Sequence, residues 1–242
     1  MSSLASAADN RDRFEPRVFQ DGDYKLPYRL LMPKPYDAKQ KYPLVIFLHG
    51  AGERGDDNQK QLVHGMNDFA SDEIMTRYPA QVFAPQCPSG EQWGGINRLA
   101  RSPTPPDKFA PALEAALKAV DALRKELSID DRRIYITGLS MGGYGTWDAL
   151  AKRTELFAAA APICGGGDPS QASNFKDIPI WAFHGADDET VRVERSREMI
   201  EALKVAGGNP KYTEYPGVGH NSWTQTYADP ALYEWLFAQR KE

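Results

Sequence analysis

The stretch Leu44–Leu48, with the sequence LVIFL, is a continuous apolar run that ends at His-Gly. A run of this length without polar alternation is typical of a strand that is buried on both faces, as in a parallel sheet. Ile134–Thr137 and Ile178–His184 are similar runs, and amphipathic segments separate them. Because parallel strands are joined by helical crossovers, this alternation predicts an α/β fold with a doubly wound, mostly parallel sheet flanked by helices.

The same patterns predict the remaining elements. Further strands are expected at Gln81–Ala84, Phe157–Ile163 and Lys211–Tyr215, and an antiparallel leading hairpin at Arg17–Gln20 and Tyr24–Met32. Helices are expected at Gln59–Phe69, Pro111–Leu127, Tyr144–Ala151, Val193–Val205 and Pro230–Gln239. The segment between Cys164 and Ile178 is too short for a helical cap, so no cap domain is expected.

Residues 1–16 are expected to be a disordered leader that precedes a single α/β domain at residues 17–242. The leader lacks the basic and apolar regions of a signal peptide, yet Ala5-Ser6-Ala7 resembles the end of one. Two interpretations stay open. The protein is secreted or periplasmic and has lost its signal peptide, or it is cytoplasmic with an alanine- and serine-rich leader.

Charge and apolar patterning exclude several classes of partner. The chain carries 29 basic and 33 acidic residues, for a net charge of −4, and has no basic stripe, so no nucleic-acid partner is expected. No apolar run approaches the roughly 18 residues of a membrane span, so no membrane partner is expected either. These features carry no information on the oligomeric state.

Cys87 and Cys164 both follow expected strands. In the predicted sheet two other strands lie between those strands, and three spacings of about 4.8 Å exceed the ~7 Å limit for bridged Cα atoms. We therefore predict buried thiols rather than a disulfide. The chain has neither CxxC nor HExxH nor another cluster of histidine and cysteine, so we predict no metal site and no cofactor.

The segment Gly138–Gly143, GLSMGG, lies where an expected strand meets an expected helix. In a G-x-S-x-G turn the serine adopts a strained backbone, and side chains at Gly138 and Gly142 would collide with the neighbouring strand and helix. The helix that begins at the serine points free N–H groups and a positive dipole end at the reaction centre. Ser140 is therefore a candidate nucleophile.

A nucleophilic serine needs a base, and the base needs an acid that orients it. In this architecture the acid and then the histidine follow the serine along the chain. Two of the four histidines precede Ser140 and His184 ends a strand, whereas His220 lies in a glycine-containing loop beyond the last strand. His220 is thus the candidate base, and Asp187 and Asp188, after the preceding strand, are both candidates for the acid.

Acyl transfer also requires donors for the negative charge that develops on the carbonyl oxygen. One expected donor is the N–H of Met141, directly after the serine. The other is expected in the sequence His-Gly-Ala-Gly-Glu after Leu44–Leu48, where small residues allow the backbone to approach a substrate. We assign this second oxyanion-hole donor to Ala51.

Four segments resemble the α/β-hydrolase superfamily: FLHGAGERG, TGLSMGGYGTW, HGADDETVRVERS and GVGHNSW. More narrowly, they are similar to bacterial carboxylesterases near carbohydrate esterase family 1, in the phospholipase/carboxylesterase or "predicted peptidase" group. The resemblance extends from Arg17 to the end of the chain. It implies that the acid is Asp188, the last residue of His-Gly-x-x-Asp, and not Asp187. It departs at Arg192, where relatives usually carry proline, beyond the acid loop.

Two tryptophans are candidate substrate-binding residues. Trp93 lies in a long loop expected to face the site, and Trp223 follows His220 closely. Aromatic faces suit a sugar or a phenolic ring, although packing within the loop is the alternative for Trp93. The resemblance implies feruloyl or acetyl esters on plant polysaccharides.

These residues together predict a serine carboxylester hydrolase that acts through an acyl-enzyme on a small-molecule or polysaccharide-linked ester. Two alternatives stay open. One is a serine peptidase, and the other is a non-catalytic carbohydrate-binding module on a hydrolase fold.

Overall fold

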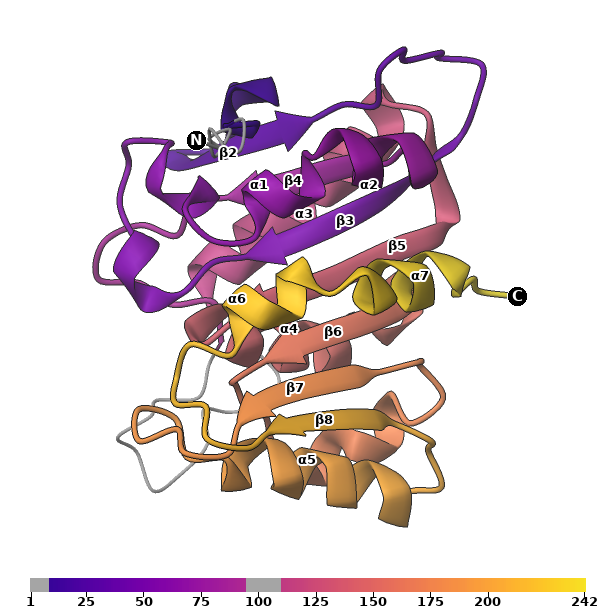
Figure 1. Cartoon of the computed structure of the whole chain (residues 1–242). Coiled ribbons are helices and arrows are strands. Elements are labelled where there is room, and N and C mark those ends of the chain that lie inside the picture. The colour runs from indigo at the N-terminus through magenta and orange to yellow at the C-terminus, as the bar shows by residue number, and fades with distance from the viewer. Residues whose placement is uncertain (1–8, 95–109) are drawn as a thin grey trace, which may run out of the picture.

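The computed structural model describes residues 9–94 and 110–242, which form one eight-stranded sheet with helices on both faces (Figure 1). The strands are β1 (Phe14–Asp21), β2 (Tyr24–Leu31), β3 (Tyr42–Leu48), β4 (Gln81–Pro85), β5 (Ile129–Leu139), β6 (Ala159–Ile163), β7 (Trp181–Gly185) and β8 (Lys211–Tyr215). Their order across the sheet is β1-β2-β4-β3-β5-β6-β7-β8.

The sheet is antiparallel at one edge and parallel elsewhere. β1 pairs antiparallel with β2 and β2 with β4, and every neighbouring pair from β4 to β8 is parallel. The predicted α/β fold with an antiparallel leading hairpin is confirmed. β1 begins at Phe14, so the sheet starts inside the segment predicted as a leader, and residues 1–8 of that segment lie outside the described residues.

Seven α-helices cover the sheet: α1 (Met66–Phe69), α2 (Asp72–Arg77), α3 (Pro111–Glu126), α4 (Met141–Lys152), α5 (Glu194–Val205), α6 (Trp223–Ala228) and α7 (Pro230–Ala238). This count covers the described residues only. Figure 1 shows α1, α2, α6 and α7 in front of the sheet and α3 and α4 behind it. Five 3₁₀ turns join these elements: η1 (Arg11–Arg13), η2 (Ala51–Glu53), η3 (Lys60–Leu62), η4 (Thr154–Leu156) and η5 (Pro169–Asn174).

Each face of the sheet has its own hydrophobic core. Buried residues of α3, α4 and α5, such as Leu113, Trp147 and Leu203, form one cluster with side chains of the sheet. Those of α1, α6 and α7, such as Phe69, Tyr227 and Leu236, form the other. The central strand β3 is buried along its whole length because it is covered on both faces, which explains its uninterrupted apolar sequence.

The helix expected at Gln59–Phe69 is interrupted. η3 and α1 occupy parts of this segment, and Gly65 before α1 has a φ of +72°, in the left-handed region that favours glycine. A Cβ at Gly65 would lie 2.6 Å from the ring of Tyr227 in α6. The turn is therefore set by a packing contact with the far end of the chain, which the local pattern could not reveal.

Two further sequence predictions concern the cysteines and the membrane. Cys87 and Cys164 are buried and are not joined by a disulfide, as predicted. Within the described part of the chain, no helix has the length and apolarity needed to cross a membrane.

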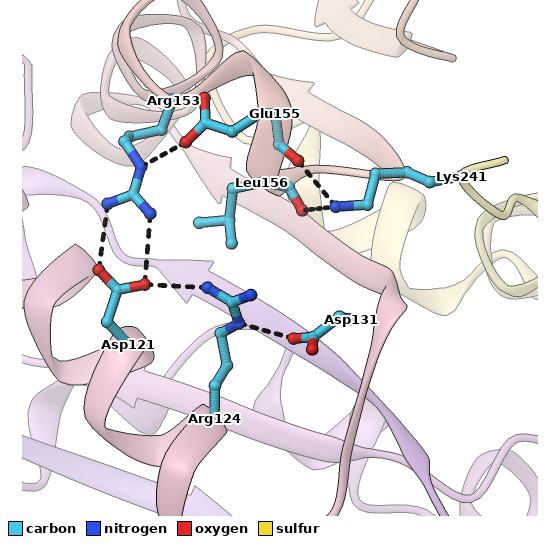
Figure 2. Close-up of polar contacts among 7 residues, drawn as sticks. All are labelled: Asp121, Arg124, Asp131, Arg153, Glu155, Leu156 and Lys241. Carbon is cyan, nitrogen blue, oxygen red and sulfur yellow. Dashed lines mark hydrogen bonds and ion pairs between the residues drawn. The ribbon is translucent and has the colours of Figure 1, made fainter.

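A network of ion pairs and hydrogen bonds joins α3, β5, η4 and the C-terminus (Figure 2). Asp121 of α3 accepts two hydrogen bonds of 3.2 Å from Arg153 and one of 3.1 Å from Arg124. Arg124 also donates to Asp131 at 2.7 Å, and Lys241 donates to two carbonyl oxygens of η4 at 2.7 and 3.0 Å. These contacts lie near the amino ends of β5 and β6, at the opposite end of those strands from Ser140. They hold the crossover helix and the C-terminus to the sheet.

The network predicts a pH-dependent contribution of Asp121 to stability. Burial alone would raise the pKa of Asp121, but the ion pairs with Arg153 and Arg124 outweigh burial and lower the pKa below its ordinary value. A carboxyl with a lowered native pKa stabilises the fold above its unfolded pKa, and the contribution is lost as the pH falls through the native value. Asp121→Asn should therefore lower the free energy of unfolding at pH 7 by about 1 kcal/mol, with the difference shrinking below about pH 4.

Urea unfolding of both proteins at pH 7 and pH 3 measures this difference. Asp177→Asn is the matched control, because the side chain of Asp177 is 83% exposed and forms an ion pair with its sequence neighbour Lys176. A deficit of equal size at both pH values would show that Asp121 acts through packing and not through its charge.

Candidate active site

Ser140 occupies a sharp turn between β5 and α4. Its φ of 54° and ψ of −112° lie outside the ordinary regions for a residue with a side chain, so the turn is strained. The neighbouring glycines allow this turn. A Cβ at Gly142 would lie 1.8 Å from the carbonyl oxygen of Leu48, and one at Gly138 would lie 2.5 Å from the carbonyl oxygen of Gly142. The strand-to-helix turn predicted for this segment is confirmed, together with the steric reason for its glycines.

A hydrogen-bonded chain leads from Ser140 through His220 to Asp188. His220 Nε2 lies 2.9 Å from Ser140 Oγ, and His220 Nδ1 lies 2.7 Å from Asp188 Oδ2. Because a carboxylate can only accept, His220 donates from Nδ1, and its Nε2 is then free to accept the hydroxyl hydrogen of Ser140. This is the tautomer that a general base at this serine requires.

The side chain of Asp188 is buried and held by its loop, whereas the adjacent Asp187 is exposed. The other oxygen of Asp188, Oδ1, accepts hydrogen bonds of 2.8 Å from the backbone N–H groups of Thr190 and Val191, and the residue is 6% exposed. Asp187 is exposed, and its backbone N–H donates to the carbonyl of Val218. Of the two aspartates, the structure brings Asp188 to His220, in agreement with the position that the family resemblance implied.

The two predicted oxyanion donors follow two adjacent parallel strands. Met141 is the first residue of α4, after β5, and Ala51 is the first residue of η2, after β3. The N–H groups at the start of a helical segment have no acceptor within that segment. Gly50 brings the two loops close together, because a Cβ there would lie 2.8 Å from the side chain of Leu139. The geometry therefore places two backbone donors at the same edge of the sheet as Ser140.

His49, which the sequence analysis set aside, supports this loop. Its Nδ1 donates to the carbonyl oxygen of Gly50 at 2.6 Å, and its Nε2 accepts from the N–H of Cys87 at 2.9 Å. Burial lowers the pKa of His49 to about 4, so the ring is neutral at pH 7 and can donate from one nitrogen and accept at the other. His49 therefore ties the end of β3 to the end of β4.

The prediction that Trp93 binds substrate is wrong. Its side chain is 0% exposed, its Nε1 donates to the carbonyl of His49 at 3.1 Å, and its ring stands edge-on to the ring of His49. A Cβ at Gly145 of α4 would lie 2.4 Å from Trp93 Cβ, so α4 packs directly on this tryptophan. Trp93 is a packing residue behind the Ala51 loop, because burying its large ring there stabilises the fold.

Trp223 lies beside the histidine of the site. Its half-buried ring packs edge-on against the ring of His220, with centroids 5.2 Å apart. The ring of His64 packs against it at a tilt, with centroids 5.3 Å apart. His64 is a neighbour of the site that sequence order alone excluded. Trp223 therefore borders His220, as expected from its position three residues later.

One cluster among the described residues combines three potential metal ligands. Ligand atoms of Cys164, Asp188 and His220 all lie within 4.8 Å of one another. A metal ion there would have to replace the hydrogen bond between Asp188 and His220. As they stand, these two side chains are arranged for proton transfer to and from Ser140.

Taken together, the site holds a serine hydroxyl, a base with the correct tautomer, a fixed carboxylate and two backbone donors. These are the parts that acyl transfer to serine requires. They come from the carboxyl ends of β3, β5, β7 and β8, which all meet at one edge of the sheet.

Comparisons with known proteins agree with this geometry. Residues 36–231 match the phospholipase/carboxylesterase family. The crystal structure of a thermostable esterase superposes with a TM-score of 0.90 and 45% identity, covering 95% of this chain and 64% of that one. Carboxylesterase SOBER1 of Arabidopsis thaliana is 27% identical over 73% of this chain and 82% of its own length. Probable feruloyl esterase C of Aspergillus niger is 24% identical over 82% of this chain and 68% of its own.

Some relatives are much longer than this chain. The matched region spans 22% and 12% of the first two curated relatives. The family match nevertheless includes the loops that carry Ala51, Ser140, Asp188 and His220. The chain belongs to the phospholipase/carboxylesterase family.

Proposed function

We propose that the protein hydrolyses carboxylic esters through an acyl-enzyme on Ser140. The observation that carries this proposal is the hydrogen-bonded chain from Ser140 through His220 to Asp188, with distances of 2.9 and 2.7 Å. Few structural roles require a strained serine, a histidine in this tautomer and a buried carboxylate in series, whereas nucleophilic catalysis requires all three.

In the first half-reaction Ser140 Oγ attacks the ester carbonyl carbon while its proton passes to His220 Nε2. The carbonyl oxygen becomes negatively charged and accepts hydrogen bonds from the N–H groups of Ala51 and Met141. The tetrahedral intermediate collapses, the bond to the alkoxy oxygen breaks, and His220 returns the proton to the departing alcohol. Asp188 stays ionised throughout and stabilises the imidazolium.

In the second half-reaction water takes the place of the alcohol. His220 removes a proton from the water, the resulting oxygen attacks the acyl carbon, and Ser140 leaves as the free hydroxyl with the proton from His220. The products are a carboxylic acid and an alcohol, and the enzyme returns to its starting state.

For the substrate, we propose short-chain esters or feruloyl and acetyl esters of plant carbohydrates, either as small molecules or attached to a polysaccharide. Three observations support this class. The connection from β6 to β7 contains η5 and no α-helix that could form a cap. The ring of Trp223 lies beside His220 and suits a sugar or phenolic ring. One of the relatives bears the name feruloyl esterase. Secretion or export to the periplasm would suit such a substrate, and we propose it as the location.

The first test removes the catalytic groups. Ser140→Ala and His220→Ala should each lower kcat for p-nitrophenyl acetate by a factor on the order of 10⁴ to 10⁶, and the double variant should be little worse, because the groups act as one unit. Asp188→Asn should lower kcat by roughly 10⁴, since it removes the acceptor that holds the tautomer of His220. Steady-state rates of ester hydrolysis measure all three.

Asp187→Asn is the matched control for Asp188, because Asp187 is adjacent but exposed, and His220 pairs with Asp188 instead. It should retain nearly full activity. Wild-type rates in Ser140→Ala would rule out the proposed nucleophile. Hydrolysis of a peptide anilide but of no ester would favour the serine-peptidase alternative.

The second test concerns the substrate class. Trp223→Ala should lower kcat/KM for methyl ferulate, relative to p-nitrophenyl acetate, by about threefold to tenfold, which corresponds to the loss of one stacking contact of roughly 0.5–1.5 kcal/mol. Across p-nitrophenyl esters the rate should peak at short acyl chains, because no cap from the β6–β7 connection covers a longer one.

Trp235→Ala is the control in this comparison, since Trp235 packs against Trp181 in another part of the fold. It should leave the ratio between the two substrates unchanged. A rate that rises steadily with acyl length, with no effect of Trp223→Ala on the ratio, would point to a lipase-like substrate instead.

A further inference from the structure

His184 is a second histidine in contact with the acid of the site. It lies in β7, four residues before Asp188, and its side chain is fully buried. Its Nε2 lies 3.2 Å from Asp188 Oδ2, the same oxygen that accepts from His220, and 2.8 Å from the carbonyl oxygen of Val191. Its Nδ1 lies 2.7 Å from the hydroxyl of Ser196 in α5.

These contacts determine the tautomer of His184. Nε2 faces a carbonyl oxygen and a carboxylate oxygen, which can only accept, so this nitrogen must carry a hydrogen. In the neutral ring Nδ1 then accepts from Ser196 Oγ at 2.7 Å, and that hydroxyl also lies 3.1 Å from the carbonyl oxygen of Gly165. Burial lowers the pKa of His184, although the acceptors Val191 and Asp188 act in the opposite direction, so the ring is neutral at pH 7.

We infer that His184 is a positioning residue for Asp188: its Nε2–H holds the acid loop and the carboxylate oxygen that pairs with His220, and thereby sets the basicity of His220. The inference rests on the proposed function, since it assigns a role to His184 only if Asp188 and His220 form a catalytic pair.

The geometry of the carboxylate explains this role. Oδ1 of Asp188 receives two backbone N–H groups, and Oδ2 lies 2.7 Å from His220 Nδ1 and 3.2 Å from His184 Nε2, so contacts on both sides hold the carboxylate toward His220. Val191, whose carbonyl contacts His184, is the residue whose N–H contacts Oδ1. His184 therefore holds both the carboxylate and the loop that binds it.

The same geometry has an electrostatic consequence. The N–H of His184 places a partial positive charge beside Oδ2 and so reduces the negative potential that His220 experiences. Without this N–H, the carboxylate would stabilise the imidazolium form of His220 more strongly. On acidification, His220 would then be protonated, and so lost as a base, at a higher pH than in the wild type. The acid limb of the pH profile would therefore move to higher pH.

Other titratable groups also face this cluster. Glu214 of β8 lies opposite His184 in the strand register and pairs with Arg197 of α5 at 2.6 Å. Cys164, after β6, has its sulfur within 4.8 Å of ligand atoms of Asp188 and His220. These residues are identical in the variants compared below, so a shift between those variants reports on His184.

The test compares two substitutions of His184 in the full chain. His184→Leu removes the donor, whereas His184→Gln keeps an amide N–H near the position of Nε2. The acid limb of kcat/KM for p-nitrophenyl acetate should move up by about half a pH unit in the leucine variant, and kcat should fall roughly tenfold, as the loss of an orienting hydrogen bond does at metal sites. The glutamine variant should restore most of kcat and return the acid limb most of the way to its wild-type position.

Ser196→Ala is the matched control, because it removes the partner of Nδ1 and leaves Nε2 in place. Ser196→Ala should leave the acid limb of the kcat/KM profile at its wild-type position. Thermal unfolding and the fraction of chains labelled by a fluorophosphonate correct each rate for the amount of folded enzyme. A folded His184→Leu variant whose acid limb lies at the wild-type pH would overturn the inference. It would not contradict the proposed ester hydrolysis.

A measurement on the wild-type protein covers the case in which the leucine variant does not fold. In ¹⁵N-histidine NMR spectra, His184 should appear as the neutral Nε2–H tautomer throughout the titration of His220. An Nδ1–H tautomer, or a His184 that gains a proton together with His220, would overturn the inference. The NMR readout requires no turnover, so a wild-type protein that hydrolyses no ester would refute the proposed function separately.

Discussion

The carbonyl oxygen of Leu48 lies so close to the backbone of Gly142 that even a methyl group would not fit between them. This contact presses the first turn of α4 onto the end of β3. It forces the chain to leave β5 abruptly, which puts Ser140 in its strained conformation at the edge of the sheet. It also brings the starts of η2 and α4 together, so that two backbone donors and one hydroxyl converge. The rest of the site depends on this close approach of two backbones.

Histidines serve three different purposes around this turn. His49, after β3, is buried and neutral and ties the Ala51 loop to β4. His184, at the end of β7, is buried and contacts the acid. His220, after β8, is partly exposed and contacts Ser140. The same side chain can fill each place because an imidazole can donate at one nitrogen and accept at the other, and burial decides whether it can also take up a proton.

The sequence predicted the elements whose cause is local. The apolar run of β3, the proline at the start of α3 and the glycines around Ser140 each express a constraint within a few residues, and each is confirmed. The contacts of Ser140, His220 and Asp188 were predictable because chain order and the family spacing restrict which loops can meet. Their catalytic roles stay a prediction.

The wrong predictions concern residues whose surroundings depend on contacts with distant parts of the chain. Trp93 was expected to face a substrate, but a loop tryptophan becomes a packing residue when α4 covers it, and its sequence neighbours do not reveal this. Gly65 interrupts the helix expected at Gln59–Phe69 because Tyr227 packs against it. His184 looked like an ordinary strand end, although its spacing of four residues from Asp188 was a readable signal.

The central claim is that Ser140 becomes acylated during turnover, and intact-mass spectrometry tests it most directly. The protein is mixed with p-nitrophenyl acetate, quenched in acid within the first turnover, and digested to locate the added mass. The account predicts a burst of p-nitrophenol stoichiometric with the chain and one acetyl group on the peptide that contains Ser140. An acetyl group on a peptide that lacks Ser140, or undiminished hydrolysis after a fluorophosphonate has labelled Ser140 completely, would contradict it.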